Sequence, residues 1–379
     1  MSARPPVPLS EVVAALDARY PPSWAEDWDA VGLVVGDPST AVRRVHFAVD
    51  PVAAVVAEAV SAGADVVVTH HPLFLRPVHG VPATTAKGRL VHELIGHGVA
   101  LYVAHTNADV ANPGVSDALA AALGVIAVRP LGGGVQDPLD KIVTFVPHAD
   151  TGRVVDSLAA AGAGQIGDYS RCAWMSEGTG TFLPGDGATP VIGRAGRVEV
   201  VPETRVEMVL PRSRRSAVLA ALRATHPYEE PAYDVLMLAP LPGPRGLGRV
   251  GELSDPMTLR EFTAAAAAAL PRTAWGVRAA GDPARPVRRV AVCGGAGADL
   301  AGEAAAADAD VLLTADLRHH PVLDAVTEWD LAFIDAAHWA TEWPWLPAAA
   351  RQLTSDLADT VTATVSTILT DPWTVSERP

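Results

Sequence analysis

Two short apolar runs of almost the same sequence, ADVVVT (64–69) and ADVLLT (309–314), constrain the fold of this chain most strongly. Both runs are continuous rather than alternating in hydrophobicity, which is typical of parallel strands in a sheet that helices cover on both faces. Each run follows another predicted strand, at 44–50 and 288–295, and an intervening helix. The repeated pattern predicts an α/β core of two related halves that arose by internal duplication.

The segment between the halves has a different order of predicted strands and helices. Residues 140–238 predict the order strand, helix, hairpin, strand, helix, strand, with the hairpin at 171–182. This βαββαβ order is that of a ferredoxin-like domain, and Gly/Pro-rich stretches flank it at 131–138 and 239–248. We therefore expect a domain inserted into the α/β core. The predicted domains are residues 1–138 for the first half of the core, 139–242 for the insert and 243–379 for the second half.

Composition argues against several classes of partner and site. The 379-residue chain has a formal net charge of -14, which opposes binding to a phosphate backbone. No apolar run approaches the ~20 residues of a membrane-spanning helix, and the start MSARPPVPLS lacks the apolar stretch of a secretory signal. We therefore expect a cytoplasmic protein without membrane or nucleic-acid partners. Cys172 and Cys293 form no Cys-x-x-Cys motif, so a metal would have to be bound by histidine and carboxylate.

Side chains that can bind a metal follow three of the predicted parallel strands. They are His70 and His71, His105 and Asp109, and His338 and Glu342. The carboxyl ends of parallel strands are where ligands bind in an open α/β sheet, so we expect these side chains to converge on one cleft at one edge of a sheet. Histidine with carboxylate suits zinc, manganese, iron or cobalt. His338 and Glu342 are four residues apart, which places them on one face of a helix.

Two features of the histidines leave alternatives open. His70 and His71 are adjacent, and successive side chains of an extended backbone diverge, so the pair favours a site with two metals. A single histidine at a strand end is more often a hydrogen-bonded loop residue, and it is the combination that favours metal. The pair recurs as His319 and His320, either as a second metal site or, as we prefer, as a remnant of the duplication that lines the same cleft. GGAGAD (294–299) is interpreted as a tight turn.

The chain resembles the GTP cyclohydrolase 1 type 2 homologue family, also described as dinuclear-metal-centre hexameric proteins, in its long bacterial form. The resemblance rests on WDAVGLVVGD, THHPLF, AHTNAD, HPYEEPAYDV, LLTADLRHH and DAAHWATE. It implies a PII/CutA-like insert, a toroidal homohexamer and two divalent metal ions per subunit. The ligands that it implies are His70, His71, Asp109, His338 and Glu342, with Glu342 as the bridge. Ala315 and Ala337 stand where the family usually has glycine, which leaves the local loop conformation open.

Two functions are compatible with these residues. Five protein ligands on two ions leave open coordination positions, which favours a metal-dependent hydrolase of a small substrate, with a nucleotide-like molecule as one candidate. In that hypothesis His105 orients a ligand or moves a proton, and GTP is suggested by the family label alone. The alternative is a regulatory or scaffold assembly in which metal is structural or sensed and the insert binds a partner or effector. Glu229 and Glu230 of HPYEEPAYDV would then line a cavity or partner surface, unless the segment is a plain turn.

Overall fold

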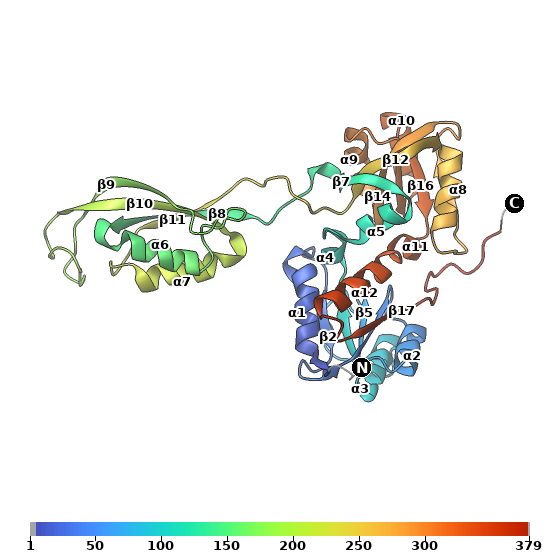
Figure 1. Ribbon diagram of the computed structural model, residues 1–379, viewed down its shortest axis with the longest axis horizontal. Helices are drawn as coiled ribbons and strands as arrows, with labels where there is room; N and C mark the ends of the chain where they lie inside the picture. The colour runs from blue at the N-terminus through green and yellow to red at the C-terminus, as the bar shows by residue number, and fades with distance from the viewer. Residues whose placement is uncertain (1–4, 378–379) are drawn as a thin grey trace. The chain divides into compact units, whose positions relative to one another are not determined.

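Both apolar runs form fully buried strands, β5 (Val66–Thr69) and β15 (Val311–Ala315), in the computed structural model, which describes residues 5–377 (Figure 1). The chain divides into two compact units. One contains the residues up to Gly134 together with those from Gly243 onwards, and the other is Val135–Pro242. The first unit carries all six side chains of the predicted site.

The first half of the larger unit is built on a five-stranded sheet. Its strands, in spatial order, are β17 (Thr362–Val365), β4 (Arg44–Ala48), β5, β6 (Ala100–Val103) and β2 (Gly32–Val35). The first four are parallel and β2 is antiparallel. Helices α2 (Ala53–Ser61) and α3 (Ala86–His97) connect β4 to β5 and β5 to β6. A separate two-stranded sheet pairs β1 (Val7–Pro8) with β3 (Ala41–Val42).

Most strands of the second half belong to a separate six-stranded sheet. Its strands, in spatial order, are β13 (Val277–Ala280), β16 (Ala332–Ala336), β15, β14 (Pro286–Ala296), β12 (Arg249–Thr258) and β7 (Val125–Pro130). Strands β14, β15 and β16 are parallel, and α9 (Ala301–Ala306) and α10 (His319–Trp329) connect them. The expectation that the site would lie at one edge of a single sheet is therefore wrong, because the core contains two separate sheets. Each sheet includes one strand from the other half of the sequence, β17 in the five-stranded sheet and β7 in the six-stranded one.

One hydrophobic core joins the two sheets. It contains buried side chains of both, for example Tyr102 of β6 and Val292 of β14, together with side chains of several helices, of which four longer ones contribute most. These four helices are α1 (Leu9–Arg19), α5 (Val115–Ala122), α8 (Leu259–Ala269) and α12 (Trp345–Asp356). Arg249 is only 1% exposed, and its guanidinium donates to both carboxylate oxygens of Asp117, at 2.8 and 2.7 Å. Because a buried guanidinium needs such partners, this pair fixes β12 against α5.

The smaller unit consists of a single four-stranded sheet and two helices that pack against it. Its elements, in chain order, are β8 (Leu139–Pro147), α6 (Thr151–Ala160), β9 (Trp174–Phe182), β10 (Glu199–Pro211), α7 (Arg215–Thr225) and β11 (Tyr233–Met237). The antiparallel sheet has the spatial order β11-β8-β10-β9. Both helices cover the same face (Figure 1), where Leu158 and Leu222 pack with Val206. The expected hairpin at 171–182 is wrong, because residues 174–182 form a single strand that pairs with β10.

The described helices were expected to include no membrane-spanning segment, and the structure agrees. No helix within residues 5–377 is both long and apolar enough to cross a membrane.

Candidate metal centre

His70 and His71 directly follow the last residue of strand β5. Their backbone N–H groups still donate to the carbonyls of Ala48 and Val49, which extend strand β4, at 3.1 and 2.8 Å. The chain bends at both histidines, so the expectation of an extended pair is wrong. The two rings lie close together, with centroids 5.1 Å apart.

His70 is fully buried and has one ring nitrogen available. Its Nδ1–H donates to the carbonyl of Ala104 at 2.9 Å, which fixes the tautomer that leaves Nε2 unprotonated in the neutral ring. Nε2 lies 3.4 Å from Oε1 of Glu342 and 3.5 Å from Oδ1 of Asp109, and it has no hydrogen-bond partner among the described residues. A buried ring nitrogen without a partner is rare in a protein, and its lone pair could bind a metal ion.

His71 and His338 are oriented in the same way by carboxylates. Nδ1–H of His71 donates to Oδ1 of Asp50, and Nδ1–H of His338 donates to Oδ2 of Asp316, both at 2.7 Å. Each ring therefore turns Nε2 toward Glu342, at 3.1 Å for His71 and 2.9 Å for His338. A carboxylate behind the imidazole is the arrangement that holds metal-binding histidines in proteins.

Glu342 is the carboxylate that the histidines share. It ends the short helix α11 (His338–Glu342), one turn after His338, and its side chain is buried. Burial alone would raise its pKa, but the charges of His71, His338 and His70 outweigh burial and hold the pKa well below its usual value. Glu342 is therefore an anion, and its Oε2 lacks a hydrogen bond. An ionised, incompletely paired carboxylate among imidazoles fits a cation.

Burial and the neighbouring carboxylates shift the pKa values of the histidines in opposite directions. Burial lowers the pKa of His338, but Glu342 and Asp316 raise it to about 10. Burial likewise lowers the pKa of His71, and the carboxylates of Glu342 and Asp50 hold it well above its ordinary value. Without metal, these raised pKa values keep His71 and His338 protonated, so positive charge surrounds Glu342. A divalent cation that binds there would displace these protons.

Asp109 and His105 lie on the side of the cluster toward the five-stranded sheet. Both belong to the turn after β6, where His105 precedes α4 (Thr106–Asp109) and Asp109 ends it. Nδ1–H of His105 donates to Oδ1 of Asp29 at 2.8 Å. Burial works against the charge on Asp29, but hydrogen bonds from His105 and Thr106 hold its pKa well below the usual range. Burial raises the pKa of Asp109, and the charges of His70 and His105 oppose this shift only in part.

Two overlapping groups within residues 5–377 have ligand atoms within 4.8 Å of one another. They are His70, His71 and His105, and His71, His338 and Glu342. The structure thus brings five of the six predicted residues into these groups and places the sixth, Asp109, beside His70. Groups of this composition could bind a metal ion.

Because Gly295 has no side chain, it leaves room for the side chains of Glu342 and His338. It has a φ of +66°, and a Cβ at this position would lie 2.6 Å from Oε1 of Glu342 and 3.1 Å from Nε2 of His338. Its N–H donates to Oγ1 of Thr341, which in turn donates to the carbonyl of His338. Gly295 belongs to the irregular end of strand β14, so the interpretation of GGAGAD as a tight turn is wrong for its first three residues, and this strand end forms one wall of the cluster.

The orienting acids were not predicted from the sequence. Asp50 comes two residues after β4, so the rule that found His70 could also have found it. Asp316 directly follows β15, so the same rule could have found it too, whereas Asp29 lies in a loop without periodicity. Asp316 has a φ of +54°, a left-handed conformation that is uncommon outside glycine and that often marks functional sites.

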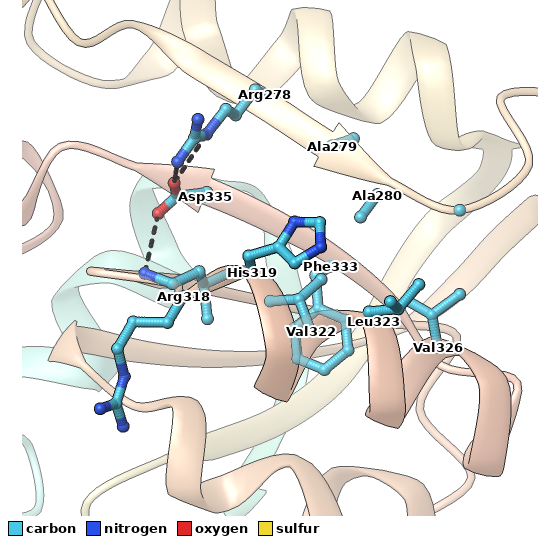
Figure 2. Close-up of a pocket in the computed structure, with 12 residues that line it drawn as sticks. Arg278, Ala279, Ala280, Arg318, His319, Val322, Leu323, Val326, Phe333 and Asp335 are labelled. Atoms are coloured by element: carbon cyan, nitrogen blue, oxygen red, sulfur yellow. Dashed lines mark hydrogen bonds and ion pairs between the residues drawn. The ribbon is translucent and has the colours of Figure 1, made fainter.

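The second histidine pair is separate from the cluster. Within the part of the chain that the structure describes, neither His319 nor His320 belongs to a group close enough to share a metal ion. Figure 2 shows His319 above Val322 and Phe333, in a cavity of about 490 Å³ that does not include His71 or His338. The prediction that this pair lines the metal cleft is therefore wrong.

The two alanines that replace a usual glycine fit their backbone. Ala337 has φ and ψ of -63° and 136°, an ordinary extended conformation. Ala315 is the last residue of β15 and is not among the residues with positive φ. Neither position requires glycine for conformational reasons, so the extra methyl groups cause no backbone strain here.

The fold and the cluster together define a class: an α/β protein of several sheets with a buried histidine and carboxylate site that could bind a metal. Within that class, the chain belongs to the Duf34/NIF3 (NGG1p interacting factor 3) family, whose model matches residues 7–372. The family resemblance that the sequence motifs indicated is thereby confirmed.

Relatives and solved structures cover nearly the whole chain. Proteins of Mycobacterium tuberculosis and Mycobacterium bovis, each named GTP cyclohydrolase 1 type 2 homolog, are 53% identical over 374 residues, 98% of either chain. A crystal structure of a Bacillus cereus protein related to NIF3 is 36% identical, with a TM-score of 0.76 over 98% of this chain and 99% of that one. A Staphylococcus aureus crystal structure is 28% identical, with a TM-score of 0.80 over the same shares.

Proposed function

We propose that this protein binds two divalent metal ions through His70, His71, Asp109, His338 and Glu342, and that it hydrolyses a small substrate at this centre. One observation carries the proposal: Nε2 of His70 and Oε2 of Glu342 are buried without hydrogen-bond partners at the point where the two halves of the core meet. Unpaired buried polar atoms are costly unless a ligand satisfies them. Glu342 has one oxygen near His338 and the other near His71, which suits a bridging ligand.

The residues around the cluster support a catalytic role over a purely structural one. When bound, a pair of divalent ions supplies Lewis-acid polarisation of a substrate oxygen and a water made acidic enough to react near neutral pH. His105 is positioned by Asp29 and turns its other ring nitrogen toward the histidine cluster, so it can accept or return a proton there. Asp50 and Asp316 hold their imidazoles in the orientation that binding requires.

A cavity beside His71 and His338 supports a small substrate with a planar group. It has a volume of about 240 Å³, and Trp275, Trp339 and Trp373 contribute to its walls. The rings of Trp275 and Trp373 have centroids 5.6 Å apart. Indole faces stack on planar rings, including nucleobases. A nucleotide-like substrate is therefore one candidate, and the relatives' printed name makes GTP the first to test.

The test compares the metal-loaded protein with its His71→Ala variant. Formate release from GTP, and product formation across a panel of small phosphate and amide substrates, should be at least about a hundredfold faster in the wild-type protein, because the variant lacks a ligand. GTP turnover no faster than in His71→Ala rejects the cyclohydrolase activity. No turnover on any substrate, combined with melting of the fold when metal is removed, favours the regulatory alternative.

We also propose the finer points of architecture that the resemblance implies. The βαββαβ order and the strand order β11-β8-β10-β9 support a ferredoxin-like insert at Val135–Pro242. Three parallel strands joined by two helices in each half, β4 to β6 and β14 to β16, support the duplication. The homohexamer rests on the resemblance alone, and light scattering of the metal-loaded protein should then give six times the chain mass of 39.3 kDa. Metal analysis should identify zinc, manganese, iron or cobalt.

A further inference from the structure

The smaller unit contains a cavity of its own, with a volume of about 280 Å³. It lies between the end of β9, the loop that follows it and the turn HPYEEP after α7. Its lining combines three aromatic rings and three carboxylates, from Phe145, Phe182, Tyr228, Glu203, Glu229 and Glu230, and no lysine or arginine lines it. The segment that the sequence singled out at 226–235 therefore helps to form a cavity that is both aromatic and acidic.

Glu203 is the most buried of the three carboxylates, at 7% exposure. Its Oε1 accepts a hydrogen bond from the Tyr228 hydroxyl at 2.6 Å. Its Oε2 lies against Gly180, where a Cβ would be 2.0 Å away, and receives no hydrogen bond from any described residue. A buried carboxylate is stable when a cation or several donors accompany it. Glu203 accepts from Tyr228, and no lysine or arginine lines the cavity beside it, so a cation in the cavity would supply its counter-charge.

Tyr228 presents both a donor and an aromatic ring. Burial and the neighbouring Glu203 raise its pKa, so the hydroxyl stays protonated and donates to that carboxylate. The ring lies between those of Phe182 and His226, with centroids 5.6 and 5.1 Å away. Burial lowers the pKa of His226, so this imidazole adds no positive charge. The faces of Tyr228 and Phe182 carry the negative side of the ring quadrupole, which attracts cations.

We propose that this cavity binds a small organic cation, a primary ammonium group on an apolar body, with Glu203 as its counter-ion. The ammonium donates to Oε2 of Glu203, and the apolar body packs on Phe182, Leu183 and Ile192. A metal ion fits less well, because no group of three ligating side chains among the described residues of this unit lies close enough to share one. The volume is near the lower end of the range for small-molecule pockets, roughly 300–1,000 Å³. This inference does not depend on the proposed hydrolase activity.

The full-length protein and three ligands of similar shape test the proposal. They are 2-phenylethylamine, 2-phenylethanol and 3-phenylpropanoate, which differ in charge at one end. Isothermal titration and saturation-transfer NMR should show the amine binding at least about tenfold more tightly than the alcohol, because a hydrogen bond between charged groups is the stronger one. The carboxylate should not bind. Equal binding of amine and alcohol, or no binding of the amine at millimolar concentration, overturns the proposal.

Two matched variants locate the binding. Glu203→Gln keeps an oxygen that accepts from Tyr228 but removes the charge, so the amine should bind about tenfold or more weakly. Glu177→Gln removes an exposed carboxylate on the adjacent strand β9, outside the cavity, and should leave amine affinity within about twofold. Equal amine affinity in the two variants contradicts the assignment. If Glu203→Gln does not fold, the preference of the wild-type protein for amine over alcohol still decides the outcome.

Discussion

Nε2 of His71 lies 3.1 Å from Oε2 of Glu342, although the histidine follows a strand of one sheet and the glutamate follows a strand of the other. The two residues are 271 positions apart in the sequence. The site therefore exists only when both halves of the core are folded and packed on each other. Its geometry links the integrity of the core to any metal chemistry.

Replacing Glu342 by glutamine should remove the carboxylate that the two metal ions are proposed to share. The amide keeps the size of the side chain but loses the charge that balances three histidines, so we expect bound metal to fall from two ions per chain to one or none. Elemental analysis of protein purified from metal-supplemented medium measures this. Glu328→Gln, an exposed position on α10, is the control. Equal metal content in the two variants would contradict the proposed role of Glu342.

Replacing Asp316 by asparagine should weaken binding without unfolding the chain. Asparagine tolerates the left-handed backbone at this position, φ +54°, but removes the charge behind His338. Loss of such an orienting group typically reduces metal affinity about 10–100-fold. Competition titration with a zinc indicator provides the measurement. Asp330→Asn, at φ +50° and far from the cluster, is matched in backbone and chemistry and should bind normally.

Replacing Gly295 by alanine should remove the site through a steric clash. The same change at Gly98, with a φ of +67° and no atom within 4 Å of the added Cβ, carries the same left-handed strain of about 1–2 kcal/mol. Both variants should therefore lose at least this much stability in denaturant unfolding, and Gly295→Ala should lose more because of its clash. Only Gly295→Ala should lose metal, because its Cβ displaces Glu342. Normal metal content in Gly295→Ala would show that the wall formed by this strand end is not needed.

The stability of the smaller unit should depend on pH through His226. Its Nε2–H donates to the carbonyl of Phe145 and its Nδ1 accepts from the N–H of Tyr228, so the folded ring is neutral. Burial lowers its pKa below the ordinary 6.5, although Glu203 and Asp150 oppose this shift. The unfolded chain then binds more protons below about pH 6.5, and stability is lost as pH falls through this value toward the folded pKa.

His226→Gln isolates that contribution, because glutamine can donate to Phe145 but does not titrate. We expect the free energy of unfolding of the wild-type protein to fall relative to the variant by up to about 1.4 kcal/mol per pH unit below pH 6.5. Hydrogen exchange of amides in β8 and β10 reports this for the smaller unit. A difference between the two proteins that stays constant from pH 5 to 7 would refute the prediction.

The strands that carry the site were predictable because they are buried on both faces. A strand of this kind appears as a continuous apolar run, and the runs 64–69 and 309–314 contain β5 and nearly all of β15. His70 and His338 follow such strands, and they were predicted because ligands bind at the carboxyl ends of parallel strands. The turn that carries Asp109 follows β6 for the same reason.

Other parts of the structure depend on contacts that local patterns do not encode. The apolar runs do not specify which strands are hydrogen-bonded neighbours, so the two separate sheets were not foreseen. Asp29 and Asp316 act through hydrogen bonds to His105 and His338, 76 and 22 residues away. Gly295 has a positive φ at the end of strand β14, and only the packed core shows that it leaves room for Glu342.

Anomalous diffraction from crystals grown with zinc or manganese tests the central claim most directly. Data on either side of the metal absorption edge should show two peaks, about 3.5–4 Å apart, within bonding distance of Glu342 and of histidines from both halves of the core. Metal peaks located only elsewhere on the protein, or a cluster that stays empty in metal-replete crystals, would contradict the account.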